Sequence, residues 1–452
     1  MRLPRDGAFA WALPAAACAL VSCALRTGGS WTPPPEDGST DDAREHAWDA
    51  EGGPDGEGDL DDEVSGEDPV SPDPVEPEDG VEETEPDGPE EDPAAEDPAG
   101  EEPAETWLGD WAARVPMTID PADVDADLAD FPFLVHLGTV SGRFGDDMTF
   151  IFDALGGDGN RKKIAVTEGD GVTQCFVEIE RWDSAAHEAW LWVKAPFVSG
   201  ASETVFYLYY DAGQPANTAH VDDTAAGNSV NVWDGDALLV CHLDETAGAR
   251  SADSTANGND GQPRPGLSMD VEGMMAGGDE FDGVDDAIDL PYLGTETALT
   301  VEIWFYGYGP WAEHNPLISN VAWFDGVVHF KVKGSGTTVP GELVATAGST
   351  ARIASGIAHP TDRWTYAAYS VDHTGPDTFK LYADGAEVAS GDELTEGVDL
   401  GLMIGAEVTD RFWSGILDEA RISRTARDPA WIRATYESGI DDLVAYGFEE
   451  TP

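Results

Sequence analysis

The feature that most limits what this chain can fold into is a long acidic segment near its N-terminus. Between residues 32 and 105 the sequence is mostly Asp, Glu, Pro, Gly and Ala, with about thirty acidic residues and one arginine, Arg44. Such a composition cannot bury enough apolar surface to offset the conformational entropy lost on folding. We therefore expect a disordered, extended acidic tether, and a folded region that begins near Trp107.

The residues before the tether have the layout of a bacterial signal peptide. A basic start precedes an apolar run over residues 9–21, which is too short to span a bilayer. The run ends in the letters LVSC, which resemble the bacterial lipobox, whose cysteine is acylated as the first mature residue. We expect a signal peptide over residues 1–22, a lipid anchor at Cys23 and a place at the outer membrane or cell surface. Ordinary cleavage near residues 15–17 is the alternative.

The excess of acidic residues limits the kinds of molecule that this chain can bind. The chain of 452 residues carries 90 acidic and 23 basic residues. An acidic surface of this kind repels phosphate backbones, so we exclude nucleic acid as a partner. Neutral glycans, basic proteins and divalent cations are compatible with it. A chain of this length is expected to hold two or more folded domains.

Residues 107–222 read as a β-sandwich. Apolar runs typical of strands, separated by turn signals, occupy residues 115–119, 131–137, 148–152, 175–182, 189–193 and 204–210. Five segments of this region follow one another in an order that resembles the domain of unknown function 2341. They are VPMTID, DFPFLVHL, VEIERWD, AWLWVKAP and FYLYYDAG. The resemblance implies a bacterial surface protein in which this domain precedes a LamG-like domain. It implies no activity.

Residues 228–449 form the second predicted domain. Five of its segments resemble those of LamG-like, concanavalin A-like jelly-roll domains: FDGVDDAIDL, LTVEIWF, RWTYAAYSVD, KLYADGAEVASG and WSGILDEARISRTAR. The first segment, residues 281–290, predicts a hairpin of two strands with Gly283 at positive φ in the turn. A short helix is expected over Pro429–Glu437, with Asp428 as its N-cap. The predicted fold class is all-β, with two β-sandwich domains behind the acidic tether.

Two glutamates of the first domain are the candidates for catalysis. Glu178 and Glu180 are two residues apart on one predicted strand, so their side chains share a face. A carboxylate pair of this kind could serve a retaining glycosidase. A solvated strand face is the simpler interpretation, and we assign no catalytic residue. In the second domain Asp418 and Glu419 are adjacent on a strand and are expected to face opposite ways.

A turn-rich loop at residues 253–261 suggests a cation site. It fails the EF-hand pattern, because Thr255 stands at the third position and Arg264 at the twelfth. The LamG resemblance implies a possible calcium site with oxygen ligands from Asp253, Asn257 and Asp418. Capping of the turns by Asp253 and Asn257 is the alternative.

Three tryptophans are candidates for ligand binding. Trp311, Trp323 and Trp413 flank loops rich in Gly, Asn and Asp, and a sugar ring can stack on an exposed indole. Packing at the rim of the sandwich is the alternative. Trp304 and Trp364 lie within predicted strands and are expected in the core.

Two cysteines belong to the folded region. Cys175 and Cys241 each lie in an apolar, strand-like run, so we expect buried free thiols rather than a disulfide between the domains.

Together these features predict a surface lipoprotein that displays a LamG-like binding module for a glycan or a protein. A glycan-active enzyme of the envelope and a passive structural or adhesive spacer are the alternatives, because jelly rolls host all three.

Overall fold

The computed structural model describes residues 106–246, 248–320, 328–348, 351–391, 397–408 and 410–452. All of them belong to one compact unit. The expected signal peptide, the acylated Cys23 and the acidic tether up to residue 105 lie outside the described residues. Within the described ranges, no helix is long and apolar enough to cross a bilayer.

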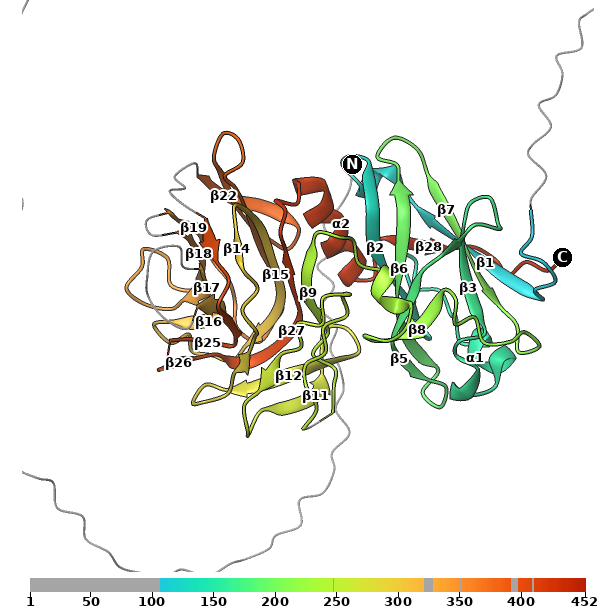
Figure 1. The fold of residues 1–452 in the computed structure, drawn as a ribbon, viewed down its shortest axis with the longest axis horizontal. Coiled ribbons are helices and arrows are strands. Elements are labelled where there is room, and N and C mark those ends of the chain that lie inside the picture. The colour runs from blue at the N-terminus through green and yellow to red at the C-terminus, as the bar shows by residue number, and fades with distance from the viewer. Residues whose placement is uncertain (1–105, 247, 321–327, 349–350, 392–396, 409) are drawn as a thin grey trace, which may run out of the picture. The chain divides into compact units, whose positions relative to one another are not determined.

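The described chain is almost entirely β-structure, as predicted, and the first sandwich holds two sheets (Figure 1). Alternate residues of its strands, such as Val115 and Met117, are fully buried and meet in one core. The five-stranded sheet has the order β28 (Val444–Tyr446), β1 (Ala113–Ile119), β7 (Thr204–Tyr210), β3 (Ile164–Glu168), β4 (Gln174–Cys175). The four-stranded sheet has the order β2 (Leu128–Leu137), β6 (Glu188–Val198), β5 (Val177–Asp183), β8 (Val221–Asp223).

The second sandwich packs two larger sheets around a core that includes Phe281, Val301 and Phe330. One sheet has the order β10 (Gln262–Pro263), β13 (Ile288–Asp289), β24 (Leu402–Ile404), β16 (Asn315–Asn320), β17 (Val328–Lys333), β18 (Glu342–Ala347), β19 (Ala351–Ala358). The other has the order β11 (Ser268–Glu272), β12 (Gly277–Asp282), β27 (Ser414–Ser423), β15 (Ala298–Gly307), β20 (Trp364–Asp372), β21 (Thr378–Ala383), β22 (Ala386–Gly391), and β27 also pairs with β9 (Ala237–Cys241). Two short ladders join β14 (Thr295–Glu296) to β23 (Val398–Asp399) and β25 (Ala406–Glu407) to β26 (Arg411–Phe412).

The helical elements are few. They are α1 (Phe150–Leu155), α2 (Pro429–Gly439) and the 3-10 turns η1 (Pro121–Asp123), η2 (Asp158–Asn160) and η3 (Ser229–Asn231). The strand predicted over residues 148–152 is wrong, because Thr149 is the N-cap of α1 and the helix begins at Phe150. Thr149 donates its N–H and its hydroxyl to Asp147, which favours a turn there, and Gly156 at φ +86° ends the helix.

The second helix, α2, begins where the sequence predicts it. Asp428 accepts the N–H of Trp431 at 2.8 Å, and Pro429 begins α2. This helix lies between the two sandwiches and contacts β2 of the first and β22 of the second (Figure 1). It therefore links the two sandwiches.

Residues 281–290 differ from the predicted hairpin. Gly283 has φ +78°, as expected for the turn. The strands on either side, however, belong to different sheets, because β12 pairs with β27 and β13 pairs with β24. The turn therefore crosses from one layer of the sandwich to the other.

The C-terminal strand also differs from the predicted domain division. It was expected in the second domain, but β28 pairs with β1 of the first sandwich. Ser438, at the end of α2, accepts the N–H of Leu134 on β2 at 2.7 Å. The chain thus returns to its first sandwich after completing the second.

Candidate functional site

Charged side chains are buried where the two sandwiches meet, a region we call the seam. The seam cluster consists of Glu178 and Glu180 on β5, His242 just after β9, and Glu419 and Arg421 on β27. Each of them is at most 7% exposed. Burial of so many ionisable groups is costly unless they satisfy one another.

His242 stands at the centre of this cluster. Its Nδ1 lies 2.6 Å from Glu419 Oε1 and 3.6 Å from Glu180 Oε2, and its Nε2 lies 3.7 Å from Glu178 Oε2. Burial alone would lower the pKa of the imidazole, but the carboxylates of Glu419 and Glu180 outweigh it and raise that pKa well above its usual value.

Each carboxylate of the cluster has a further partner. Glu178 accepts hydrogen bonds from Trp233 Nε1 and Ser254 Oγ, both at 2.7 Å, and Glu180 accepts one from Trp192 Nε1 at 2.7 Å. Burial raises the pKa of Glu180 to about 8, although the charge of His242 opposes this shift.

Two of the glutamates lie at β-bulges, which change the direction of their side chains. Along β5, Ile179 pairs with Leu191 but Arg181 pairs with Trp190, so Glu180 lies at an irregularity. Along β27 a similar irregularity contains Glu419, whose φ is +53°. Bulges re-aim side chains and are common beside functional sites.

The β27 bulge also explains a difference from the prediction for Asp418 and Glu419. They were expected to face opposite ways, but the register of β27 shifts between Asp418 and Arg421, so regular alternation does not hold there. Both are buried, and the charges of Glu419 and Glu180 add to the burial that raises the pKa of Asp418 well above normal. Asp418 Oδ2 accepts the N–H groups of Met274 and Met275.

The interpretation of Glu178 and Glu180 as a solvated strand face is therefore wrong. The pair shares a face, as predicted, but that face is covered by the second sandwich.

Beside the seam cluster a cleft of about 530 Å³ opens between the sandwiches. We call it the seam cleft. Side chains from both sandwiches line it, among them Asp158, Arg161, Glu180, Arg181, Trp182, Asp223, Asp244 and Glu245. Arg181 crosses the seam, donating to the carbonyl oxygens of Ala276 and Asp244 and pairing with Asp270. Trp182 is half-buried, with its ring 4.8 Å from that of Phe152.

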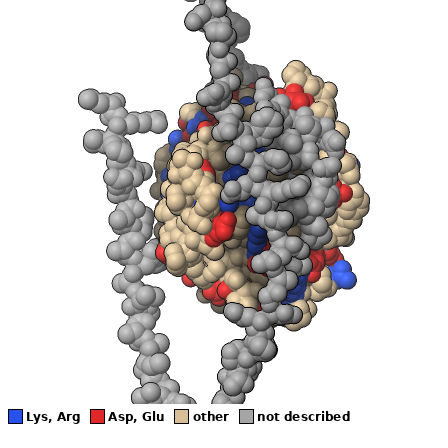
Figure 2. Space-filling model, turned by 90° about the vertical axis from the view of Figure 1, so that its left-hand side faces the viewer, with Lys and Arg blue, Asp and Glu red and all other residues tan. Residues whose placement is uncertain are grey.

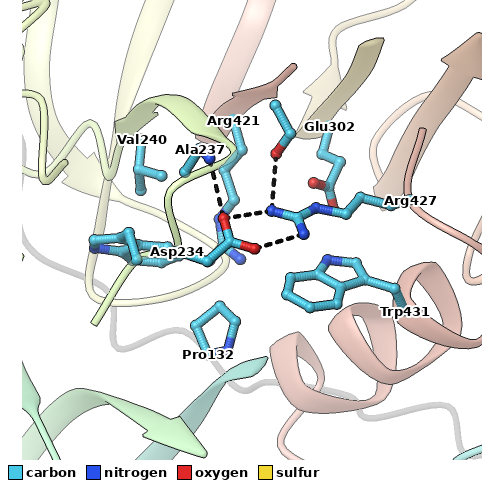
Figure 3. Close-up of a pocket in the computed structure, with 10 residues that line it drawn as sticks. Pro132, Asp234, Ala237, Val240, Glu302, Arg421, Arg427 and Trp431 are labelled. Carbon is cyan, nitrogen blue, oxygen red and sulfur yellow. Dashed lines mark hydrogen bonds and ion pairs between the residues drawn. The ribbon is translucent and has the colours of Figure 1, made fainter. Parts of the chain in front are cut away.

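A smaller, more enclosed cavity lies at Arg421 (Figure 3). There Arg427 donates two hydrogen bonds to Asp234, at 2.6 and 2.7 Å, and Trp431 and Pro132 close the space from the side of α2 and β2. Its volume of about 20 Å³ holds about one water molecule, so it is too small for an organic ligand.

The residues predicted to bind calcium make other contacts. Asp253 accepts three backbone N–H groups, and Asn257 donates to two backbone carbonyls. Asp418 is engaged with the backbone at Met274 and Met275. These contacts are those of turn capping, and calcium binding by the three residues stays a prediction.

Two groups of described residues bring possible metal ligands together. Glu180, His242 and Glu419 form the buried group, and Asp282, Asp285 and Asp286 form a mostly exposed one in the turn after β12. Within each group the donor atoms lie within 4.8 Å of one another.

The tryptophans predicted to bind ligand are packed in the two cases that the structure describes. Trp413 is fully buried, with its ring 5.6 Å from that of Phe305 and 5.9 Å from that of Trp311. Trp311 lies so close to Gly307 that an added Cβ would meet its indole at 2.2 Å. Trp413 therefore offers no free face for a sugar ring, and Trp311 shows rim packing. Trp323 lies outside the described residues.

Figure 2 shows the outer end of the second sandwich, the end with β16 to β19. On the described part of this face uncharged residues prevail, and both basic and acidic side chains lie beside the residues drawn in grey.

Both cysteines of the folded region are buried and free, as predicted. Burial raises the pKa of the Cys175 thiol to about 12, so this sulfur is a poor nucleophile.

The comparison with protein families agrees with the fold. Residues 282–433 match the family model described as the Concanavalin A-like lectin/glucanases superfamily. This part of the chain is a concanavalin A-like domain. The match does not extend to the first sandwich, and no curated protein matches the chain.

Several solved structures are similar to part of the chain. One is domain 4 of AbnA, a GH43 extracellular arabinanase from Geobacillus stearothermophilus, in complex with arabinotriose. It is 19% identical with a TM-score of 0.36, over 44% of this chain and 98% of that one. The binding domain of Paraclostridial Mosquitocidal Protein 1 is 14% identical with a TM-score of 0.36, over 45% and 52%. The Botulinum neurotoxin type G receptor binding domain is 12% identical with a TM-score of 0.34, over 45% and 51%. The chain spans about half the length of the two toxin domains.

Sequence reasoning missed His242, Arg421, Arg181 and Trp182. The one available signal was the position of His242, an ionisable residue inside the apolar word LLVCHL. Nothing in the sequence indicated which acids surround it.

Proposed function

We propose that the two sandwiches act together as a binding module and that the seam cleft takes a saccharide. The observation that carries this proposal is the composition of the cleft: one half-buried indole, Trp182, beside charged side chains from both sandwiches. Its volume of about 530 Å³ is within the range typical of ligand sites.

The lining suits the two kinds of surface on a sugar. The apolar face of a pyranose ring stacks on an indole, while its hydroxyls exchange hydrogen bonds with carboxylates and guanidinium groups. Arg161 is already held by Asp223 through bonds of 2.7 and 2.8 Å, so its orientation costs little on binding. The several carboxylates of the lining favour a neutral saccharide over an anionic one.

Trp182→Ala is expected to weaken saccharide binding at least about tenfold, which corresponds to about 1.4 kcal/mol. A glycan array probed with the full-length protein would select the saccharide, and calorimetric titration would compare affinities. Tyr292→Ala is the matched control, because Tyr292 is 63% exposed on the second sandwich and does not line the cleft.

Equal affinities of the two variants would contradict the proposal, and an array without any bound glycan would favour a passive spacer or a protein ligand. Shorter saccharides appearing after long incubation would instead favour the glycan-active enzyme.

We also propose that the module is held at a bacterial surface by acylated Cys23, since a tethered module needs an anchor. Each buried acyl methylene contributes about 0.8 kcal/mol, so two or three chains hold a protein firmly.

Cys23→Ala should therefore release the protein from the membrane fraction or leave an uncleaved precursor. A metabolic fatty-acid label should mark the wild type and not the variant. An unlabelled wild type with a different mature N-terminus would replace the anchor with plain secretion.

A further inference from the structure

The seam cluster has the composition and geometry of a metal centre. We propose that Glu180, His242 and Glu419 bind one divalent transition-metal ion of the zinc class. Their donor atoms lie within 4.8 Å of one another. His242 follows β9 and Glu419 lies on β27, which pairs with β9, whereas Glu180 comes from β5 of the first sandwich. This inference does not depend on saccharide binding in the cleft.

The donor set selects the class of ion. One imidazole nitrogen and two carboxylate oxygens suit Zn²⁺ and its first-row neighbours, whereas Ca²⁺ takes six to eight oxygen ligands. Donors about 2.1 Å from a shared ion lie about 3 to 3.5 Å apart. His242 Nδ1 lies 2.6 Å from Glu419 Oε1 and 3.6 Å from Glu180 Oε2, so sub-ångström shifts bring these two pairs to those separations.

Two of the three ligands also have an outer hydrogen-bond partner of the kind that orients metal ligands. Glu178 Oε2 lies 3.7 Å from the second nitrogen of His242, which is beyond hydrogen-bond distance. Arg421 donates to Glu419 Oε2 at 2.6 and 3.0 Å, so it holds the oxygen that does not face His242. Trp192 donates to Glu180 Oε2.

Unpartnered polar atoms supply an independent observation. Within the part of the chain that the structure describes, His242 Nε2 and Glu180 Oε1 are buried and make no hydrogen bond, so two of the three proposed ligands carry an unsatisfied polar atom. Buried polar atoms without a partner are rare, and a bound ion is one way in which such atoms are satisfied.

The surrounding charge also favours a cation. Three buried acids, Glu178, Glu180 and Glu419, surround the imidazole of His242, and only Glu419 among them is hydrogen-bonded to Arg421. Glu180 also lines the seam cleft, which gives an ion a route from solvent to the cluster.

The test uses full-length, tag-free protein that has been stripped with a chelator. Titration with ZnCl₂ should show one ion bound per chain and a higher melting temperature. Glu180→Gln should weaken binding at least about tenfold while preserving the shape of the side chain. Asp285→Asn, in the exposed aspartate group, is the matched control and should bind as tightly as the wild type.

Absorption-edge spectroscopy of the zinc-loaded wild type keeps the proposal testable if Glu180→Gln does not fold. It should show nitrogen or oxygen scatterers near 2.0–2.2 Å with an imidazole contribution. Absence of binding, undiminished binding by Glu180→Gln, loss of binding in Asp285→Asn, or a spectrum without imidazole would each overturn the proposal.

Discussion

Arg421→Ala is expected to lower the free energy of unfolding by about 4 kcal/mol, because it removes the buried guanidinium that satisfies the second oxygen of the buried Glu419 carboxylate. Arg421 is 7% exposed and donates two hydrogen bonds to Glu419, at 2.6 and 3.0 Å. Its guanidinium also lies 4.2 Å from the ring of Trp192 and 4.9 Å from that of Trp233. Urea unfolding of wild type and variant measures the difference.

Arg363→Ala is the control for this prediction. Arg363 pairs with Asp384 at 2.6 Å, but its side chain is 56% exposed. Solvent screens such a pair, so its loss should cost less than about 1 kcal/mol. Similar small losses in both variants would show that the seam does not bury the Arg421 charge.

The second large effect is a dependence of stability on pH that originates at Asp279. This side chain on β12 is fully buried, and neither of its oxygens makes a hydrogen bond within the described residues. Burial, with the charge of Glu245 adding to it, raises its pKa from 3.8 to about 8. The folded state therefore keeps a proton that the unfolded state releases above about pH 4.

The sign follows from this difference in bound protons. Between about pH 4 and pH 8 the contribution of Asp279 to stability falls as pH rises, by on the order of 5 kcal/mol in total, and it levels off above pH 8. Asp279→Asn cannot titrate, so its stability relative to the wild type should rise across this window.

Urea midpoints at pH 5 and pH 8 test the prediction. Glu272→Gln is the control, because Glu272 is exposed on the neighbouring strand β11 and should leave the pH dependence of the wild type unchanged. If the pH dependence of Asp279→Asn matches that of Glu272→Gln, Asp279 is ionised in the folded state and our account of it is wrong.

The sequence predicts the elements whose signals are local. Alternating apolar residues identified most of the strands, and Asp428 with Pro429 identified the start of α2. The predictions failed where pairing is long-range. The strands on either side of Gly283 lie in opposite sheets, and β28 returns to β1 across more than three hundred residues.

The seam could not be predicted because it depends on two bulges and on the packing of two domains. A regular β27 would turn Asp418 and Glu419 to opposite faces, and the bulge that contains Glu419 breaks this alternation. The sequence also gives no sign that Glu178 and Glu180 would be covered by His242 and its neighbours. The composition of the neighbouring loops made tryptophans the candidates for ligand binding, but the side chain of Trp413 is buried in the core.

The most direct test of the proposed seam cleft is hydrogen–deuterium exchange of the full-length protein with and without its selected saccharide. Our account predicts slower exchange on both sides of the cleft, over residues 179–183 of the first sandwich and 244–252 of the second. Protection confined to β16–β19, at the opposite end of the second sandwich, would contradict it.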